Sequence, residues 1–213
     1  MNRFLTHTVG HLRRFLGGLA AASLLIGAHP ANGANGAEKP AVDVFTDVAG
    51  QPHRLPGRGE CRALVLIFIA HDCPMSNGYA PEIARLCKEF TPRGATFRIV
   101  YAERDLAFVD AARHAKEFAF PCPAILDREL RLAARIGATL TPEAALLSPE
   151  GTVLYLGRID DIYADFGKKR TQPAHRDLRD AIEAVLAGRA VTQVRTPGLG
   201  CQIDFGPHQA DQK

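Results

Sequence analysis

A continuous apolar run, ALVLIFIA, occupies residues 63–70 of the chain. A run without polar alternation is typical of a strand that is covered on both faces of a sheet. In the segment that follows, apolar residues recur with the i, i+3, i+4, i+7 spacing of a helix face, at Ile83, Leu86, Cys87 and Phe90. The pattern therefore predicts a buried strand followed by an amphipathic helix, with Cys87 as an inert core thiol.

The remaining segments alternate in the same way, and from residue 63 onward their order is β-α-β-α-β-α-β-β-α. The further strands expected are residues 96–102, 122–126, 143–148 and 152–159, and the further helices are residues 106–119, 129–137 and 173–188. The turn SPEGT predicts that the last two strands form a hairpin, and residues 41–45 and 53–55 predict a short leading hairpin. Right-handed crossovers then give an α/β fold, with a central mixed β-sheet and helices on both faces.

Composition and charge narrow the range of functions. The chain has 213 residues, of which 46% are hydrophobic and 23% charged, as expected for a globular domain with one core. Its formal net charge is only +3, and the lysines and arginines are scattered along the chain. Such a weak and dispersed positive charge excludes a nucleic-acid partner.

The N-terminal segment, residues 1–37, has the pattern of an export signal peptide. Arg13 and Arg14 precede an apolar stretch, FLGGLAAASLLIGA, and a small-residue region, ANGANGA, follows it. The apolar stretch is short for a bilayer, where about 20 residues are needed. We therefore predict a periplasmic or cell-envelope protein with no stable membrane span after signal removal, a main domain at 38–195 and a flexible C-terminal tail at 196–213.

Export changes what the cysteines can do, because disulfides persist in an oxidising compartment. Five cysteines follow the signal: Cys61, Cys73, Cys87, Cys122 and Cys201. The count is odd, so at least one of them is free or pairs with another molecule. The chain has no Cys-x-x-Cys pair, which argues against a structural zinc knot, and we predict neither a metal nor a cofactor.

Cys73 stands where the apolar strand gives way to the helix. With Pro74 at the first helical position, Cys73 takes the N-cap, next to unpaired backbone N–H donors and the positive end of the helix dipole. Those donors stabilise a thiolate, so we expect an acidic and accessible thiol at Cys73. Asp72 opposes this effect and a protonated His71 would favour it; the alternative is that Cys73 only packs the start of the helix.

The order of elements, the cysteine at the end of a central strand and the Thr141-Pro142 pair that opens a later strand resemble the thioredoxin superfamily. Within it, the chain is most similar to the redoxin branch, which includes peroxiredoxin-like and TlpA-like exported proteins. The residues that carry the resemblance are IFIAHDCP, Pro81, the TPE of residues 141–143 and the GRIDD of residues 157–161. It spans roughly residues 41–195 and implies a thioredoxin-like fold and a redox-active, antioxidant thiol chemistry.

The chain departs from two patterns of these relatives. A thioredoxin or TlpA-type reductase has Cys-x-x-Cys, whereas here Ser76 takes the place of the second cysteine. Peroxiredoxins carry Pro-x-x-x-Thr-x-x-Cys, whereas Leu66 and Ala70 stand in the proline and threonine positions. Dithiol chemistry within the helix turn is therefore excluded, and the second thiol has to come from elsewhere.

The resemblance and, separately, the register of the SPEGT hairpin assign roles to residues distant from Cys73. Pro142 is expected to be the cis-proline that such proteins hold against the active cysteine, with Thr141 beside it. Pairing Ser148 with Thr152 places Pro142 opposite Arg158 and brings Arg158, Asp160 and Asp161 to the sheet end that carries Cys73. There Arg158 can steady a thiolate and the two carboxylates can relay protons or bind a partner, unless they form only surface ion pairs.

The other cysteines differ in their expected roles. Cys61 is structural or incidental, and Cys122, between two prolines, is expected to be buried. Cys201 lies in LGCQI beyond the last helix, and by resemblance to peroxiredoxins that resolve from the C-terminus it is the candidate partner of Cys73.

Two classes of function remain. The first is an exported thiol oxidoreductase in which Cys73 attacks a disulfide or a peroxide, with a thiol or disulfide protein as partner. The second is a non-enzymatic thioredoxin-fold carrier or interaction domain, with copper as candidate cargo held by Cys73, His71 and either Cys201 or His208. A homodimer is kept as an alternative to the monomer.

Overall fold

The computed structural model describes residues 44–55 and 59–206. The chain divides into two units, residues 1–39 and 40–213, and all described residues belong to the second. The predicted signal peptide and His208 lie outside the described residues. Within the part that is described, no helix has the length and apolar character to cross a membrane.

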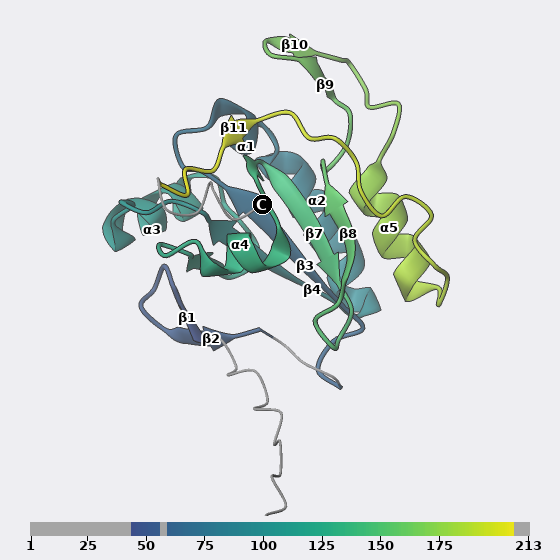
Figure 1. Ribbon diagram of the computed structural model, residues 1–213, viewed down its shortest axis with the longest axis horizontal. Helices are drawn as coiled ribbons and strands as arrows, with labels where there is room; N and C mark the ends of the chain where they lie inside the picture. Colours follow the sequence, from purple (N-terminus) through teal and green to yellow (C-terminus); the bar gives the residue numbers. More distant parts are fainter. Residues whose placement is uncertain (1–43, 56–58, 207–213) are drawn as a thin grey trace, which may run out of the picture. The chain divides into compact units, whose positions relative to one another are not determined.

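A seven-stranded mixed sheet forms the centre of the domain (Figure 1), in the order β2-β1-β5-β4-β3-β7-β8. β3 pairs in parallel with β4, and β4 with β5, while β7 is antiparallel to β3 and β8 is antiparallel to β7. The bounds of the seven strands are β1 Val44–Asp47, β2 Pro52–Arg54, β3 Ala63–Ile69, β4 Ala95–Tyr101, β5 Ala124–Leu126, β7 Glu143–Leu147 and β8 Val153–Gly157. The leading hairpin and the β7–β8 hairpin are both as predicted.

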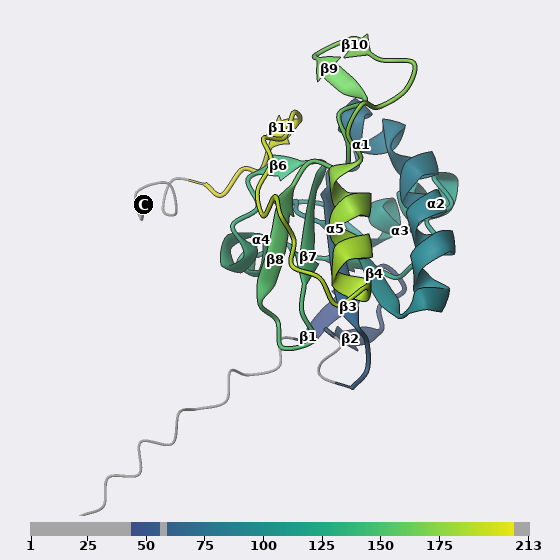
Figure 2. The same ribbon diagram turned by 90° about the vertical axis from the view of Figure 1, so that its right-hand side faces the viewer.

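Helices cover both faces of this sheet, which confirms the predicted fold (Figure 2). One face packs against α2, α3 and α5, and the other packs against α4. The helices are α1 Pro74–Gly78, α2 Ala80–Phe90, α3 Phe108–Glu117, α4 Arg131–Ile136 and α5 Asp177–Leu186, with a short 3-10 turn at Thr91–Arg93.

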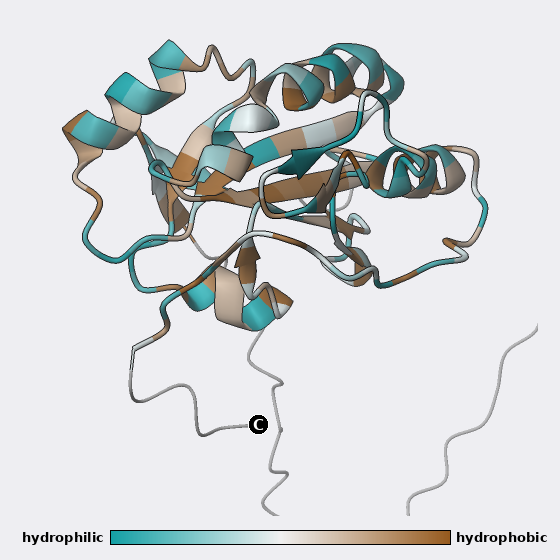
Figure 3. Ribbon diagram, turned by 90° about the horizontal axis from the view of Figure 1, so that it is seen from above, coloured by the Kyte–Doolittle hydropathy of each residue, from teal (hydrophilic) through white to brown (hydrophobic). Residues whose placement is uncertain are grey.

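β3 is the core of the domain because every one of its residues is buried. Its alternate side chains enter two separate apolar clusters: Val65 and Ile67 face α2, while Leu66 and Phe68 face α4. Figure 3 shows the same contrast, with hydrophobic strands at the centre and helices that alternate in hydropathy. The uninterrupted apolar run in the sequence follows from this double burial.

The helical region after β3 consists of two helices rather than the single one that the pattern predicts. α1 ends at Gly78, and α2 begins at Ala80, with Tyr79 between them. Pro81 explains the interruption, because proline has no N–H to donate to the carbonyl of Asn77 and its ring crowds the preceding turn. The short α1 therefore carries Cys73 at its start, separately from the longer helix.

Three small strands lie outside the main sheet. β9 (Tyr163–Asp165) and β10 (Lys168–Lys169) form a hairpin between β8 and α5 that the sequence pattern did not predict. β11 (Cys201–Gln202) pairs in antiparallel fashion with β6 (Leu140–Thr141), which directly precedes β7.

Residues 194–203, which we call the C-terminal strap, run back over the edge of the sheet. Thr196 is buried, its N–H donates to the Leu156 carbonyl, and its hydroxyl lies 2.6 Å from that of Tyr155. Gly157 permits this approach, because a Cβ at that position would overlap Thr196. Residues 196–203 of the predicted flexible tail are therefore held in place by strand pairing and buried contacts.

Candidate functional site

Cys73 takes the position that the sequence predicts, at the N-cap of α1 with Pro74 at the first helical position. Its backbone is extended, with φ −83° and ψ 111°, and its carbonyl accepts the Asn77 N–H that closes the first turn. The side chain, however, is only 1% exposed. The expected accessible thiol is therefore corrected to a buried one.

The strap brings Cys201 against Cys73. Cys201 pairs with Thr141 across β11 and β6, and its sulfur lies 2.8 Å from the sulfur of Cys73. The Cys73 sulfur is also 3.3 Å from the Thr141 carbonyl oxygen. Cys201 itself is exposed, so the two sulfurs differ sharply in their access to solvent.

The two thiols also differ in acidity. Burial of the sulfur raises the pKa of Cys73, but hydrogen bonds from the Cys201 thiol, from the side chain and backbone N–H of Ser76 and from the Met75 N–H outweigh it, and the pKa is lowered from its ordinary value. Partial desolvation raises the pKa of Cys201 to about 11, helped by the hydrogen bond to Cys73 and the charge of Asp72. Cys73 is therefore the more acidic thiol of the pair.

Thr141 and Pro142 lie directly beside this pair. The Thr141–Pro142 peptide bond is cis, as the sequence resemblance implies, and Thr141 is buried. Gly200 makes the close approach of the strap possible, because a Cβ at that position would overlap the backbone carbonyl of Thr141. A glycine directly before Cys201 is therefore required for the two sulfurs to meet.

Arg158 lies one residue out of the predicted register with Pro142, although both residues line the same pocket. A register shift between Leu146 and Leu147 moves the pairing by one residue, so that Ala144 faces Gly157, and this offsets Arg158 from Pro142. The Arg158 guanidinium donates to the carboxylate of Asp177 on α5, with Nε 2.7 Å from Oδ2. The Arg158 guanidinium, which was expected to stabilise the Cys73 thiolate, is therefore paired with Asp177 instead.

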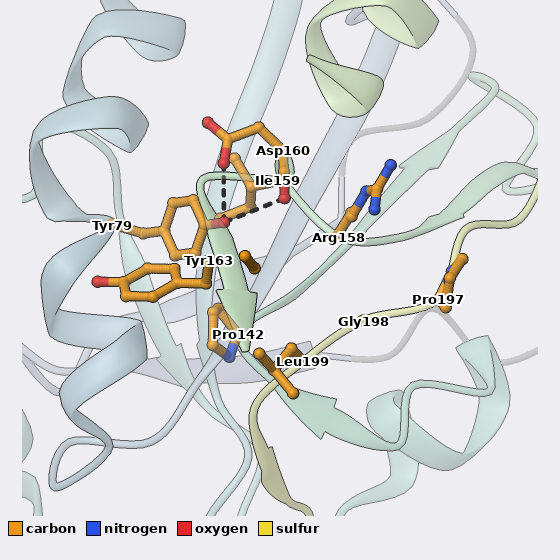
Figure 4. A pocket seen from close by; sticks show the side chains of 10 residues that line it. Tyr79, Pro142, Arg158, Ile159, Asp160, Tyr163, Pro197, Gly198 and Leu199 are labelled. Atoms are coloured by element: carbon orange, nitrogen blue, oxygen red, sulfur yellow. Dashed lines mark hydrogen bonds between the residues drawn. The ribbon is translucent and has the colours of Figure 1, made fainter. Parts of the chain in front are cut away.

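The two carboxylates after Arg158 have structural partners. Asp160 accepts the Tyr79 hydroxyl at 2.8 Å, and Asp161 accepts the N–H groups of Ala174 and His175. Figure 4 shows Tyr79 and Asp160 on the wall of a small pocket of about 150 Å³, with Pro142, Arg158 and the Pro197–Leu199 part of the strap around it. These carboxylates fix the loop after β8 and are not free to relay protons.

A larger hollow, of about 610 Å³, is lined in part by Thr141 and Cys201. His71, Asp72 and Glu103 line it, and their potential ligand atoms lie within 4.8 Å of one another. The His71 ring nitrogen Nδ1 is already 2.7 Å from Glu103, which also accepts the His71 N–H. We assign no metal to this group, because surface carboxylates gather in this way without one.

Two supports of the site were missed in the sequence. Glu103 fixes His71, and Asn77 joins α1 to α3, since its amide donates to the His71 carbonyl and its Oδ1 lies 2.9 Å from His114 Nε2. The buried His114 ring also lies 2.8 Å from the Tyr101 hydroxyl. The position of Asn77, one helical turn after Cys73, was the only feature of the sequence that could have pointed to its role. Its partner on α3, His114, is distant in the sequence, so the contact itself could not be predicted.

The model of the family described as Redoxin matches residues 34–168, which is more than half of the chain. None of the curated proteins matches. A hypothetical protein from Sinorhizobium meliloti 1021 is similar in structure, with TM-score 0.68, 24% identity and coverage of 77% of this chain and 91% of that one. An uncharacterized conserved protein from Geobacillus kaustophilus has TM-score 0.66, 25% identity and coverage of 77% and 88%.

These findings confirm the resemblance stated from the sequence. The family match covers the β3–α1 junction with Cys73 and the Thr141-Pro142 pair, and the two similar structures share the fold of the domain. Together they support a thiol oxidoreductase with a thioredoxin-like fold.

Proposed function

The chain belongs to the Redoxin family, and from this membership we propose that it is a thiol oxidoreductase in which Cys73 is the nucleophile and Cys201 the second thiol. One observation carries the proposal: the two sulfurs lie 2.8 Å apart although 128 residues separate them. Thr141 and Pro142 hold the strap and α1 in this arrangement. Arg158 has a supporting position only, through its ion pair with Asp177.

The proposed substrates are peroxides or disulfides. With a peroxide, the Cys73 thiolate attacks one oxygen, the O–O bond breaks, and Cys73 becomes a sulfenic acid while water or an alcohol leaves. With a disulfide, Cys73 forms a mixed disulfide and one thiol leaves. In both cases the Cys201 sulfur then attacks Cys73, which yields a Cys73–Cys201 disulfide and releases water or the second thiol.

Burial of Cys73 sets the order of events. Because its side chain is 1% exposed, a substrate reaches it only after the two-residue pairing of β11 with β6 opens. In the disulfide form, by contrast, an external reducing thiol meets Cys201 first, at the hollow lined by His71 and Glu103. Cys73 is then the leaving group, a role that its lowered pKa favours.

Peptide mapping tests the assignment of the two sulfurs. We expect that mild hydrogen peroxide converts the purified protein to a form with a Cys73–Cys201 disulfide, and that a Cys61→Ser control forms the same link. A disulfide between Cys73 and Cys61 or Cys122, or Cys73 present only as sulfinic acid beside a reduced Cys201, would remove Cys201 from the mechanism.

We also propose export to the periplasm or cell envelope, with cleavage of residues 1–37. The basis is the arginine pair, apolar stretch and small-residue region of the sequence. Cell fractionation with sequencing of the mature N-terminus tests this. We expect an envelope protein that begins near residue 38, and a cytoplasmic protein that retains Met1 would contradict it.

A further inference from the structure

A second pair of thiols lies elsewhere in the domain, and the proposed function does not use it. Cys87 is on α2 and Cys122 is on the segment that enters β5, and their sulfurs are 3.8 Å apart. Cys73 stands at the start of α1, whereas Cys87 lies near the end of α2, so the two thiol pairs occupy different ends of the helical region.

We propose that Cys87 and Cys122 form a second disulfide, a structural brace that links α2 to the β5 side of the sheet. It does not depend on the chemistry of Cys73. When Cys73 pairs with Cys201 as well, four of the five cysteines are in disulfides. Cys61 is then the one cysteine left unpaired.

The local geometry favours this bond. A disulfide needs the two sulfurs about 2.05 Å apart, so the pair has to close by less than 2 Å, which small side-chain rotations can supply. Pro121 and Pro123 flank Cys122 and restrict the backbone on both sides of it. Cys87 is fixed on the buried face of α2, so neither thiol has to leave its element.

The two thiols are suited to act in order. Both thiols are largely withdrawn from solvent, since Cys122 is half-buried and Cys87 is 4% exposed. The hydrogen bond between the thiols raises the pKa of Cys87 and lowers that of Cys122, and the positive charge of Arg98 adds to the second effect. The Arg98 guanidinium donates from Nη1 to the Phe97 carbonyl, and its buried Nε has no hydrogen-bond partner.

The oxidant in this proposal is another disulfide, either of glutathione or of a protein. The Cys122 thiolate attacks one of its sulfurs, the S–S bond breaks, and one thiolate leaves with a mixed disulfide at Cys122. Cys87 then loses its proton and attacks the Cys122 sulfur, which expels the second thiolate. The protein loses two electrons and two protons, and the oxidant becomes two thiols.

The brace closes a loop of 35 residues, and cross-links of this length stabilise a domain of this size by about 10 °C in Tm. The test uses the Cys73→Ser, Cys201→Ser double variant, so that failure of the proposed function does not affect it. The protein is unfolded, refolded in a buffer of oxidised and reduced glutathione, and compared with the same protein kept in a strong reductant, by peptide mapping and by calorimetry.

We expect a Cys87–Cys122 linked peptide and a Tm about 10 °C above that of the reduced protein. Adding Cys61→Ser should leave both results unchanged, whereas adding Cys122→Ser should abolish both. Cys87 and Cys122 recovered as free thiols, a link between Cys61 and Cys122, or equal Tm values for the oxidised and reduced proteins would each overturn the proposal.

Discussion

Replacement of Cys73 by serine is expected to reduce the turnover of hydrogen peroxide and of oxidised glutathione to the uncatalysed background, a loss of at least about a hundredfold. Serine has nearly the same shape as cysteine and keeps the N-cap of α1, so the fold should persist. Its hydroxyl remains protonated at neutral pH, however, so the site loses the thiol that attacks the substrate and keeps only Cys201, whose pKa is raised. Initial rates with dithiothreitol as reductant give the measurement.

Two further variants make this result specific. Cys61→Ser should retain nearly full activity, because Cys61 precedes β3 and lies outside the site. Cys201→Ser should still consume one equivalent of peroxide in a single turnover but should slow in later cycles. A Cys73→Ser protein that keeps its activity would refute the assignment, and a wild type without turnover that binds cuprous ion through Cys73 would favour the carrier alternative.

Replacement of Gly200 by valine is expected to separate the two sulfurs of the site. A Cβ at position 200 would overlap the Thr141 carbonyl, and the atoms that it meets are backbone atoms of Thr141 and Pro142, not the end of a flexible side chain. The pairing of β11 with β6 should therefore be lost, and Cys201 should move away from Cys73. We expect the rate of Cys73–Cys201 disulfide formation to fall at least about tenfold.

The same substitution should uncover Cys73, which the strap now buries to 1% exposure. Alkylation of Cys73 in the folded protein, followed by mass spectrometry, should accelerate at least about tenfold, because opening of the strap no longer limits access. Gly198→Ala is the matched control, since its Cβ would meet only the end of the Leu140 side chain. Equal alkylation rates in Gly200→Val and Gly198→Ala would contradict the covering role of the strap.

Much of the fold follows from local sequence patterns. The apolar run of β3 and the helical spacing of α2 each report burial on their own, so the order of strands and helices could be predicted without knowledge of contacts. Cys73 at the N-cap could be predicted in the same way, because Pro74 and the end of the apolar run mark the start of a helix.

The errors concern contacts between distant segments. The position of Arg158 was offset because a register shift between Leu146 and Leu147 has no clear residue signal in the hairpin. The sequence predicts a flexible tail from residue 196 onward. Its first part is held in place instead, because Thr196 contacts Tyr155 and Leu156, which are distant from it in the sequence. The approach of Cys87 to Cys122 has the same origin, since helix packing places α2 beside the segment before β5.

Cys201 follows Cys73 by most of the length of the domain, and this affects how the protein is made. Cys73 is translated 128 residues before Cys201, so at about 5 to 20 residues per second its sulfur waits on the order of ten seconds for its partner. During that interval Cys61 and Cys87 are its nearest neighbours along the chain. A catalyst that joins cysteines in the order in which they appear would therefore produce the wrong links first, so a cell that makes this protein should need disulfide isomerisation as well as oxidation.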